Sequence, residues 1–223
     1  MIWTPSPNFG TRKLPISLLI LHYTGMQDGP SAINWLANPE SGVSAHYVVE
    51  EDGQIIHMVK EENRAHHAGV SHWRGITDVN SASIGIEIVN PGHEWGYRPF
   101  PKEQMKSVKK LSKKIIKNLN IALPNVIGHS DIAPDRKEDP GEMFDWDYLA
   151  KHDAALATPS KNLIDPVWND EQFLYKLQSY GYKAEDKEKL IIAFQRRWRR
   201  GKVDGIIDGE CRSILHSLLL DVA

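Results

Sequence analysis

Two histidines and one aspartate stand where α/β proteins commonly place catalytic groups. His22 follows the apolar run Leu18–Leu21, and His129 follows the short apolar segment 126–128. Asp139 lies ten residues beyond His129. Strand ends in such sheets usually carry ligands and catalysts. Two histidines and a carboxylate form a known catalytic zinc set with a fourth position open for water, although three residues at this long spacing also come together by chance.

Glu87 is the second chemical signal, because it lies in the middle of the apolar segment Ser83–Val89 (SIGIEIV). An unpaired carboxylate in a central strand is costly, so it would need a cation, a metal-bound water or a hydrogen-bond cluster beside it. A desolvated glutamate with a raised pKa also suits a general base near neutral pH. An edge strand with Glu87 facing solvent fits the alternation equally well. The segment alone leaves both interpretations open.

The elements that would position these residues indicate an α/β fold with a mixed central β-sheet flanked by helices. The Leu- and Ile-rich segment Ile16–Tyr23 is typical of a strand buried on both faces. A hairpin is predicted around Asp52-Gly53. The further predicted elements are a helix over Pro30–Ala37, hairpin strands over His46–Glu51 and Gln54–Lys60, a strand over Ser83–Val89 and an amphipathic helix over Lys102–Leu119.

The last third of the chain has a different pattern. The polar stretch Lys151–Asn169 contains two prolines, which is typical of a linker at least in its first part. Helices are predicted over Asp170–Tyr180 and Asp186–Arg199, with a final helix ending at Leu220. We therefore expect a catalytic domain over residues 1–150, a linker over 151–164 and a small three-helix domain over 165–223.

Composition excludes several classes of protein. The chain has 223 residues, 27 Lys+Arg against 29 Asp+Glu, ten histidines and one cysteine. A single cysteine cannot form an internal disulfide, a Cys-rich zinc module or an iron–sulfur site. The near-neutral charge gives no electrostatic case for nucleic acid as a partner. No apolar run is long enough to span a bilayer, and no signal peptide is visible, so we expect a soluble chain.

Five segments resemble the zinc-dependent N-acetylmuramoyl-L-alanine amidases of the AmpD/AmiD type. Together they cover roughly residues 10–150 in the family's order, and the last one is highly specific. The segments are LILHYT (19–24), SAHYVVEEDGQI (44–55), HHAGVSHWRG (66–75), NSASIGIEIVN (80–90) and GHSDIAPDRKEDPG (128–141). The resemblance implies hydrolysis of the amide between the lactyl group of N-acetylmuramic acid and L-alanine in peptidoglycan or muropeptides, including 1,6-anhydro forms.

The same resemblance implies roles for five residues. His22, His129 and Asp139 would bind one Zn²⁺, whose bound water ionises near neutral pH. Glu87 would act as the acid/base, and Lys137 would stabilise the oxyanion of the transition state. Because each of these residues is present, the resemblance favours an enzyme over its alternative, a non-catalytic peptidoglycan-recognition protein on the same fold.

Three further residues match positions that line the substrate groove in this family. His67, Trp73 and Arg74 are therefore expected to contact peptide or sugar, although a hydrogen bond within its loop explains His67 almost as well. The family's related phage enzymes have a tyrosine at Ala45 and lack the strand glutamate. The combination of Ala45 and Glu87 thus points to the AmpD/AmiD branch.

The C-terminal segment resembles the three-helix peptidoglycan-binding domain. The matching pieces are IIAFQRRW (191–198) and VDGIIDGECRSIL (203–215). Helical spacing predicts an apolar stripe through Phe194 and Trp198, with the arginines of segment 196–200 on a solvated face. Asp204–Gly209 is predicted to be a turn, because its acidic spacing does not suit a calcium loop. The extra module favours the bacterial periplasm or cell envelope, while a cytoplasmic location stays open.

Overall fold

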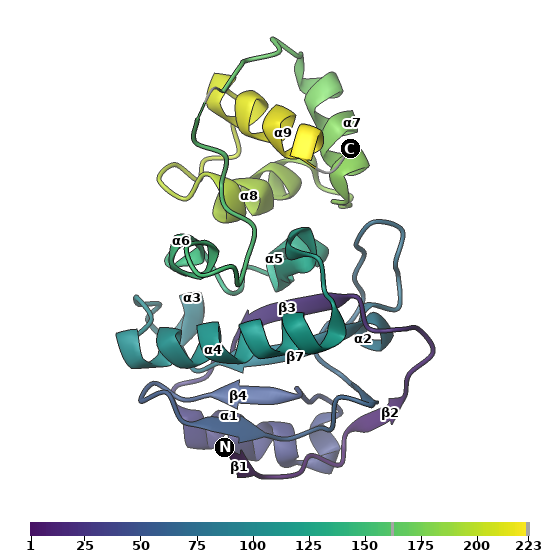
Figure 1. Ribbon diagram of the computed structural model, residues 1–223, viewed down its shortest axis with the longest axis vertical. Helices are drawn as coiled ribbons and strands as arrows, with labels where there is room; N and C mark the ends of the chain where they lie inside the picture. Colours follow the sequence, from purple (N-terminus) through teal and green to yellow (C-terminus); the bar gives the residue numbers. More distant parts are fainter. Residues whose placement is uncertain (162, 222–223) are drawn as a thin grey trace.

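A six-stranded mixed sheet forms the centre of the protein in the computed structural model, which describes residues 1–161 and 163–221 (Figure 1). The strand order is β1-β5-β4-β7-β3-β8. The β4–β5 pair is antiparallel and the other pairs of this sheet are parallel, which confirms the predicted mixed sheet and its hairpin. The strands are β1 (Ile2–Trp3), β3 (Leu18–Tyr23), β4 (Tyr47–Val49), β5 (Ile55–His57), β7 (Ser83–Ile88) and β8 (Val126–Gly128).

Strand β3 lies inside the sheet, between β7 and β8. Leu19 and Leu21 belong to the apolar cluster on one face, whereas Leu18 and Ile20 belong to the cluster on the other. All four side chains are fully buried. A strand covered on both faces needs an apolar run in place of alternation, and this is why the sequence pattern identifies it.

Helix α4 (Lys102–Leu119) covers one face of the sheet (Figure 1). Met105, Val108 and Leu111 belong to the same buried apolar cluster as Leu19 and Leu21 of β3. The helix ends at Asn120, which has a left-handed backbone (φ 52°) and donates its N–H to the Ile116 carbonyl. Both ends of this helix agree with the sequence prediction.

Two groups of helices share the opposite face. Helix α1 (Gly29–Ala37) packs its Leu36 against Val48 and Ile56 of the β4–β5 hairpin. Further along, the C-terminal helices join Leu18, Ile20 and Ile127 of the sheet in a single apolar cluster. The same face of the sheet carries the polar side chains of His22 and Glu87, which are register partners on β3 and β7.

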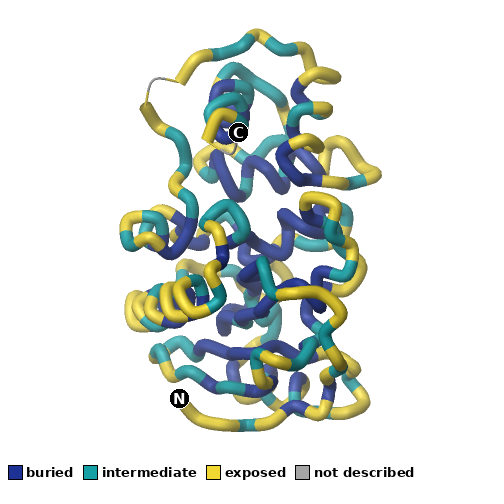
Figure 2. The backbone as a smooth tube through the Cα atoms, turned by 45° about the vertical axis from the view of Figure 1, so that its right-hand side comes forward, coloured by how far each residue is buried: buried dark blue, intermediate teal, exposed yellow. Residues whose placement is uncertain are grey.

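The C-terminal segment forms the three predicted helices, α7 (Asp170–Tyr180), α8 (Lys187–Trp198) and α9 (Gly209–Asp221). Their buried side chains, Phe173 and Phe194 among them, lie in the same cluster as Leu18 and Ile20 of β3. Figure 2 shows buried backbone continuing from the sheet into these helices. The described residues between Lys151 and Asn169 form neither helix nor strand. The helices therefore complete a core that begins in the sheet.

The predicted solvated face of α8 is wrong at two arginines. Arg197 and Arg199 are buried, with 2% and 5% of their surface exposed. The Arg197 guanidinium lies between two indole rings, 4.0 Å from the centroid of Trp146 and 3.9 Å from that of Trp198. The rings of tryptophan attract cations, so this packing lets an arginine enter the contact between α8 and the segment that carries Trp146. The predicted apolar stripe through Phe194 and Trp198 is confirmed.

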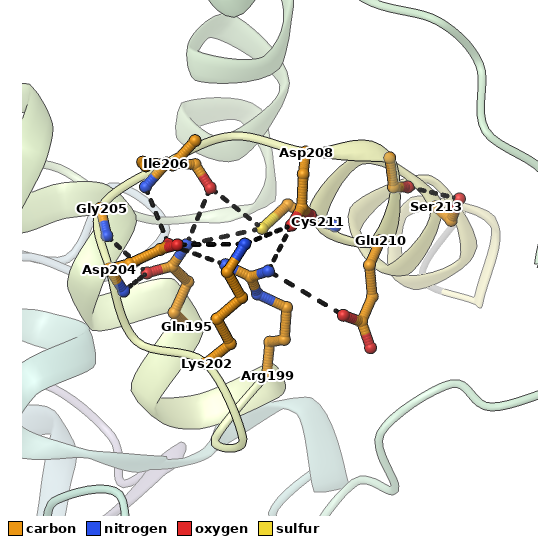
Figure 3. A network of polar contacts seen from close by, with 11 residues as sticks. Gln195, Arg199, Lys202, Asp204, Gly205, Ile206, Asp208, Glu210, Cys211 and Ser213 are labelled. Atoms are coloured by element: carbon orange, nitrogen blue, oxygen red, sulfur yellow. Dashed lines mark hydrogen bonds and ion pairs between the residues drawn. The ribbon is translucent and has the colours of Figure 1, made fainter.

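Arg199 holds the turn that precedes α9 (Figure 3). Its guanidinium donates to Asp204 Oδ1 at 3.0 Å and to the Asp208 carboxylate. Gln195 accepts the backbone N–H groups of Asp204 and Gly205, at 2.9 and 2.8 Å. The carboxylates thus have protein partners, and residues 204–208 form a non-helical connection stabilised by hydrogen bonds and ion pairs, whereas Gly209 already begins α9.

Several short elements were not predicted from the sequence. They are β1 (Ile2–Trp3), β2 (Phe9–Thr11), β6 (Asn63–Ala65), α2 (Val79–Ala82), α3 (Gly92–Trp95), α5 (His129–Ile132), α6 (Trp146–Ala150) and the 3₁₀ turns Pro39–Ser41 and Leu123–Asn125. Strands β2 and β6 pair to form a second, antiparallel sheet. Among the described residues, no helix combines the length and apolar character that crossing a membrane requires.

Candidate active site

The ends of β3 and β8 bring His22 and His129 together. Leu21 of β3 is the register partner of Gly128 in β8, so the two histidines that follow these residues are neighbours. His129 begins α5, and both imidazoles are buried. The site therefore lies at the carboxyl edge of a parallel strand pair, as expected for an α/β protein.

Asp139 reaches the same place through a loop that returns to α5. The Ser130 N–H donates to the Asp139 carbonyl at 2.8 Å. Gly128 allows the loop to come this close, because a Cβ atom there would lie 2.7 Å from Pro140 Cδ. A side chain at position 128 would therefore prevent this packing, and Gly128 allows the loop to hold Asp139 beside the two histidines.

The ligand atoms of these three residues converge on one point. His22 Nδ1 lies 3.0 Å from His129 Nδ1 and 3.0 Å from Asp139 Oδ2, and the His129–Asp139 distance between the same atoms is 3.1 Å. Among the described residues, this is the group of His, Cys, Asp or Glu side chains whose geometry suits a metal ion. Two imidazole nitrogens and a carboxylate oxygen are donors that zinc accepts in catalytic sites.

His129 also has the tautomer that a metal ligand needs. Its Nε2 lies 3.1 Å from the carbonyl oxygen of Ala68, which can only accept a hydrogen bond. The neutral ring therefore carries its proton on Nε2, and the lone pair of Nδ1 points towards His22 and Asp139. The donor set fits the zinc ion that the resemblance implies.

The local electrostatics keep His22 and Asp139 unprotonated. Burial, together with the neighbouring His129, lowers the pKa of His22 to about 4. Burial by itself would raise the pKa of Asp139, but His129 and His22 hold that pKa well below its usual range. At neutral pH the group thus offers an uncharged imidazole and a carboxylate, which are the forms that bind metal ions.

Glu87 faces this group from β7, which is a central strand. It is the register partner of His22. Ile86 and Ile88, the residues on either side of it in the strand, point to the opposite face, which α4 covers. Its Oε2 is buried and has no hydrogen-bond partner among the described residues. Burial, followed by the charge of Asp139, raises the pKa of Glu87 well above its usual value. The solvent-exposed edge-strand alternative is therefore wrong.

Lys137 enters the site from the loop between α5 and Asp139. Its backbone N–H donates to the Ala133 carbonyl at 3.1 Å, which fixes the loop two residues before Asp139. Lys137 and Glu87 both line the same cavity, and the ammonium group opposes the rise in the pKa of Glu87. The site thus has a carboxyl group and an ammonium group beside the three converging ligands.

The cavity over these residues has a volume of about 450 Å³. One part of its wall is mainly apolar and comes from α1 and the following loop, with Trp35 and Val43 exposed at 48% and 39%. The other part is charged and includes Arg136 and Glu138 beside Lys137. A ligand with an apolar portion and a polar or charged portion would find complementary surfaces here.

The structure separates the three predicted substrate contacts. His67 lines the cavity but is buried beneath His22, with its Nδ1 at 3.0 Å from His22 Nε2. Trp73 is 1% exposed and packs edge-on against Tyr182. Arg74 lies over the ring of Tyr180 and donates to the Tyr180 carbonyl at 2.9 Å. Within the described part of the chain, Trp73 and Arg74 contact the C-terminal helices and do not line the cavity.

Two residues near the site were missed from the sequence. Ser83 lies on the same face of β7 as Glu87, and its Oγ is 3.2 Å from His67 Nε2. Asn80 accepts the backbone N–H groups of His67 and Ala68, at 2.9 and 2.8 Å. The alternation of SIGIEIV contained a signal for Ser83, because every second residue of a strand shares a face. No sequence pattern pointed to Asn80.

The fold and the site define a mixed α/β protein whose candidate catalytic residues gather at the carboxyl ends of parallel strands. Residues 12–142 match the model of the Amidase_2 family, described as N-acetylmuramoyl-L-alanine amidase. The chain therefore belongs to this family and is an N-acetylmuramoyl-L-alanine amidase.

Comparisons with individual proteins agree with this family. N-acetylmuramoyl-L-alanine amidase AmiD of Escherichia coli is 33% identical, over 92% of this chain and 82% of its own. The solved complex of E. coli AmiD with anhydro-N-acetylmuramic acid-L-Ala-D-γ-Glu-L-Lys superimposes with a TM-score of 0.83, over 92% of this chain and 89% of that one. AmpDh3 from Pseudomonas aeruginosa is 29% identical, with a TM-score of 0.85 over 98% and 95% of the two chains.

A shorter relative covers a smaller part of the chain. The 1,6-anhydro-N-acetylmuramyl-L-alanine amidase AmpD of Haemophilus influenzae is 34% identical over 65% of this chain and 88% of its own length. The similarity to AmiD and AmpDh3 therefore extends over more of this chain than the similarity to AmpD.

Proposed function

We propose that this amidase uses zinc to hydrolyse the bond between the lactyl group of N-acetylmuramic acid and L-alanine in muropeptides, including 1,6-anhydro forms. The observation that carries the proposal is the convergence of His22, His129 and Asp139 with Glu87 beside them in one cavity. The names of the relatives support the substrate class, since AmiD was solved with an anhydromuropeptide described as its substrate.

Zinc bound by His22, His129 and Asp139 would supply Lewis acidity towards the scissile carbonyl and make a water molecule a stronger acid. Glu87 takes the proton of the attacking water, because burial raises its pKa and makes its carboxylate a stronger base than that of an exposed glutamate. The same carboxyl group then delivers that proton to the nitrogen of the departing L-alanine. Lys137 donates a hydrogen bond to the carbonyl oxygen as negative charge develops on it.

The two parts of the cavity wall support a substrate that combines sugar and peptide. Trp35 offers an exposed indole face, and sugar rings stack on such faces through their C–H groups. Arg136 and Lys137 suit the carboxylates of a stem peptide. The scissile amide joins these two portions, so it would lie between the walls and beside Glu87.

A non-catalytic recognition protein is the alternative on this fold. Such a protein has no need for a buried, partnerless carboxyl group beside a metal-ligand set, because both are expensive to maintain. Glu87 and the three converging ligands are all in place here. This geometry supports hydrolysis over binding alone.

The test is hydrolysis of a defined anhydromuropeptide, with products identified by mass spectrometry. The zinc-loaded protein should release a free peptide that begins with L-alanine. Glu87→Gln keeps the shape of the side chain but cannot accept a proton, so turnover should fall by about 10²–10⁴-fold while one zinc per chain is retained. Near-normal turnover by the zinc-loaded Glu87→Gln variant would remove the acid/base role.

We further infer that the C-terminal helices, residues 165–223, help to hold the enzyme on peptidoglycan. The support is their three-helix arrangement and the coverage of AmiD and AmpDh3 over nearly the whole chain. A cleft on α7 presents the rings of Trp168 and Tyr175, the latter 67% exposed. Exposed aromatic faces of this kind commonly mark a binding surface.

Point substitution tests this inference better than deletion, because the helices complete the core under β3. Tyr175→Ala should weaken sedimentation with intact sacculi and leave hydrolysis of a soluble muropeptide unchanged. Leu220→Ala is a matched control, since Leu220 is also 67% exposed but lies on α9. Equal sedimentation of both variants and the native chain would remove Tyr175 from the wall-binding surface.

A further inference from the structure

A chain of hydrogen bonds leads away from His22 on the side opposite the other two proposed ligands. His22 Nε2 lies 3.0 Å from His67 Nδ1, and His67 Nε2 lies 3.2 Å from Ser83 Oγ. The Ser83 hydroxyl in turn donates to the Val79 carbonyl at 2.6 Å. His22, His67 and Ser83 are all buried, so the chain is shielded from bulk water.

The direction of every hydrogen bond follows from the end of this chain. The Val79 carbonyl can only accept, so it takes the single hydroxyl proton of Ser83. Ser83 Oγ is then an acceptor, and His67 Nε2 must be the donor. A neutral His67 consequently has a bare Nδ1, which accepts the proton of His22 Nε2. The lone pair of His22 Nδ1 is left free.

The surroundings of His67 agree with a neutral ring. In the described part of the chain its ring nitrogens contact His22 and Ser83, and neither is a carboxylate that would stabilise an imidazolium. The protons are therefore arranged as the hydrogen-bond directions require.

The position of the His67 ring is also fixed by packing. It lies directly on Gly85 of β7, where a Cβ atom would stand 2.5 Å from His67 Cγ. Asn80 Oδ1 accepts the backbone N–H groups of His67 and Ala68. Gly85 therefore provides the space for the ring, and Asn80 holds the loop that carries it.

The loop that carries His67 and Ala68 orients both proposed histidine ligands, one through a backbone carbonyl and the other through a side chain. The carbonyl of Ala68 accepts the Nε2 proton of His129, and the side chain of His67 accepts the Nε2 proton of His22. Metal-bound histidines generally donate their second N–H to a carboxylate, a backbone carbonyl or water. His22 differs, because its partner is another histidine whose own tautomer is set by Ser83.

We propose that His67 is a positioning residue, and that with Ser83 it holds His22 in the tautomer whose Nδ1 can bind the metal ion. The proposal rests on the zinc site proposed above. It gives His67 a function other than substrate contact and explains why Ser83 and Gly85 stand on the Glu87 face of β7.

Zinc affinity, measured by competition with a chromophoric chelator in the absence of substrate, provides the main test. His67→Ala should weaken zinc binding by about 10–100-fold, the usual effect of losing an outer hydrogen-bond partner of a ligand. Ser83→Ala should weaken it to an intermediate extent, because His67 can then change tautomer. His67→Gln should recover affinity relative to His67→Ala, because its amide oxygen can accept from His22.

Ser112→Ala is the matched control for Ser83→Ala. Both serines are fully buried, but the Ser112 hydroxyl has no hydrogen-bond partner among the described residues and lies on α4. Its loss should leave zinc affinity unchanged. Two-bond ¹H–¹⁵N NMR correlations of His22 in the metal-free protein should show the proton on Nε2 in the native chain and a mixture of tautomers in Ser83→Ala.

Distinct results would overturn the positioning role. Unchanged zinc affinity in folded His67→Ala and Ser83→Ala, together with a higher KM, would make His67 a substrate contact. A proton on His22 Nδ1 in the native metal-free chain would contradict the hydrogen-bond directions. Absence of zinc binding by the native chain would overturn the proposed zinc site itself, and the positioning role with it.

Discussion

Two polar clusters in this protein both contain carboxylates and differ in their charge balance. The cluster at the carboxyl ends of β3 and β8 contains two imidazole nitrogens and the carboxylate of Asp139, which all present lone pairs to one point. The cluster before α9 contains the carboxylates of Asp204 and Asp208, but it also contains the guanidinium of Arg199 (Figure 3). The second cluster thus supplies its own cation.

This difference separates a structural network from a candidate metal site. Carboxylates that already accept hydrogen bonds from an arginine have little capacity left for an ion. Lone pairs that converge without an internal cation are stable only when a proton or a metal ion is placed among them. A cluster of acids and histidines is therefore best judged by whether the protein contributes the positive charge, and less by its residue types.

Metal removal should give the largest effect and acts on one cluster only. Chelation should reduce amidase activity to background and lower the melting temperature, because zinc stabilises the folded state to which it binds. Added zinc should restore both. Activity assays and calorimetry on chelated and reconstituted protein measure this. Full activity in protein shown to be metal-free by elemental analysis would contradict the proposed role of a metal ion at the cluster of His22, His129 and Asp139.

Removal of the internal cation should destabilise the other cluster. Arg199→Met removes the buried guanidinium that pairs with Asp204 and Asp208, and it should lower the free energy of unfolding by more than the loss of an exposed ion pair does, with zinc content unchanged. Arg98→Met is the control, since the Arg98–Glu51 pair is exposed and should contribute about 0–1 kcal/mol. Urea denaturation with elemental analysis measures both. Loss of zinc from folded Arg199→Met would show that the clusters are not independent.

Loss of the hydrogen bond between Tyr182 of the C-terminal segment and Asp131 of α5 should lower stability by a smaller amount. Tyr182 donates to Asp131 Oδ1 at 2.6 Å and accepts from Trp198 Nε1 at 3.0 Å. Asp131 lies two residues after His129. Tyr182→Phe should cost about 2 kcal/mol, because it leaves a buried carboxylate oxygen and an indole N–H without partners. Urea denaturation measures the loss. Two separate unfolding transitions in the native protein would contradict a shared core.

His46 is a third buried polar group, and it differs from the histidines of the candidate metal site because it has no carboxylate partner among the described residues. The Gly85 N–H donates to His46 Nδ1, and burial, together with Arg12, lowers the pKa of His46 to about 3. The unfolded chain, with an ordinary pKa near 6.5, binds a proton first as pH falls. Stability should therefore decrease from about pH 6.5 downwards, by about 1.3 kcal/mol between pH 7 and 5.5.

Urea denaturation of the zinc-saturated native chain and of His46→Gln at several pH values measures this contribution. Zinc saturation keeps the proposed ligands from titrating in the same range. The glutamine variant should be less stable at pH 7 but less sensitive to acid. Equal acid sensitivity of the two proteins would mean that His46 is not the group responsible.

Much of the central architecture could be predicted from the sequence. The apolar run before His22 predicted a strand buried on both faces, and the stripe through Met105 and Leu111 predicted α4 with both of its ends. These predictions succeeded because they depend on local periodicity, which follows from the geometry of one helix or strand. Short elements such as α5 were missed, because a single turn has too few residues to show a period.

Local pattern failed where burial was decided by a distant segment. Arg197 and Arg199 have the spacing of a solvated face, but Trp146 packs over one and the turn before α9 encloses the other. Trp73 lies in a segment that matches the family's groove residues, yet it is covered by the C-terminal helices. Sequence spacing does not record which segment will cover a given side chain.

The sequence by itself named the candidate catalytic residues: the predicted strands pointed to His22, His129, Asp139 and Glu87, and the family resemblance added Lys137. Tertiary structure alone decided that β7 is a central strand, so that Glu87 is buried beside the ligands, and that His67 lies under His22. The physical reason is that ligand geometry and tautomers depend on contacts between residues far apart in the chain. Such contacts form only when strand order and loop packing are set.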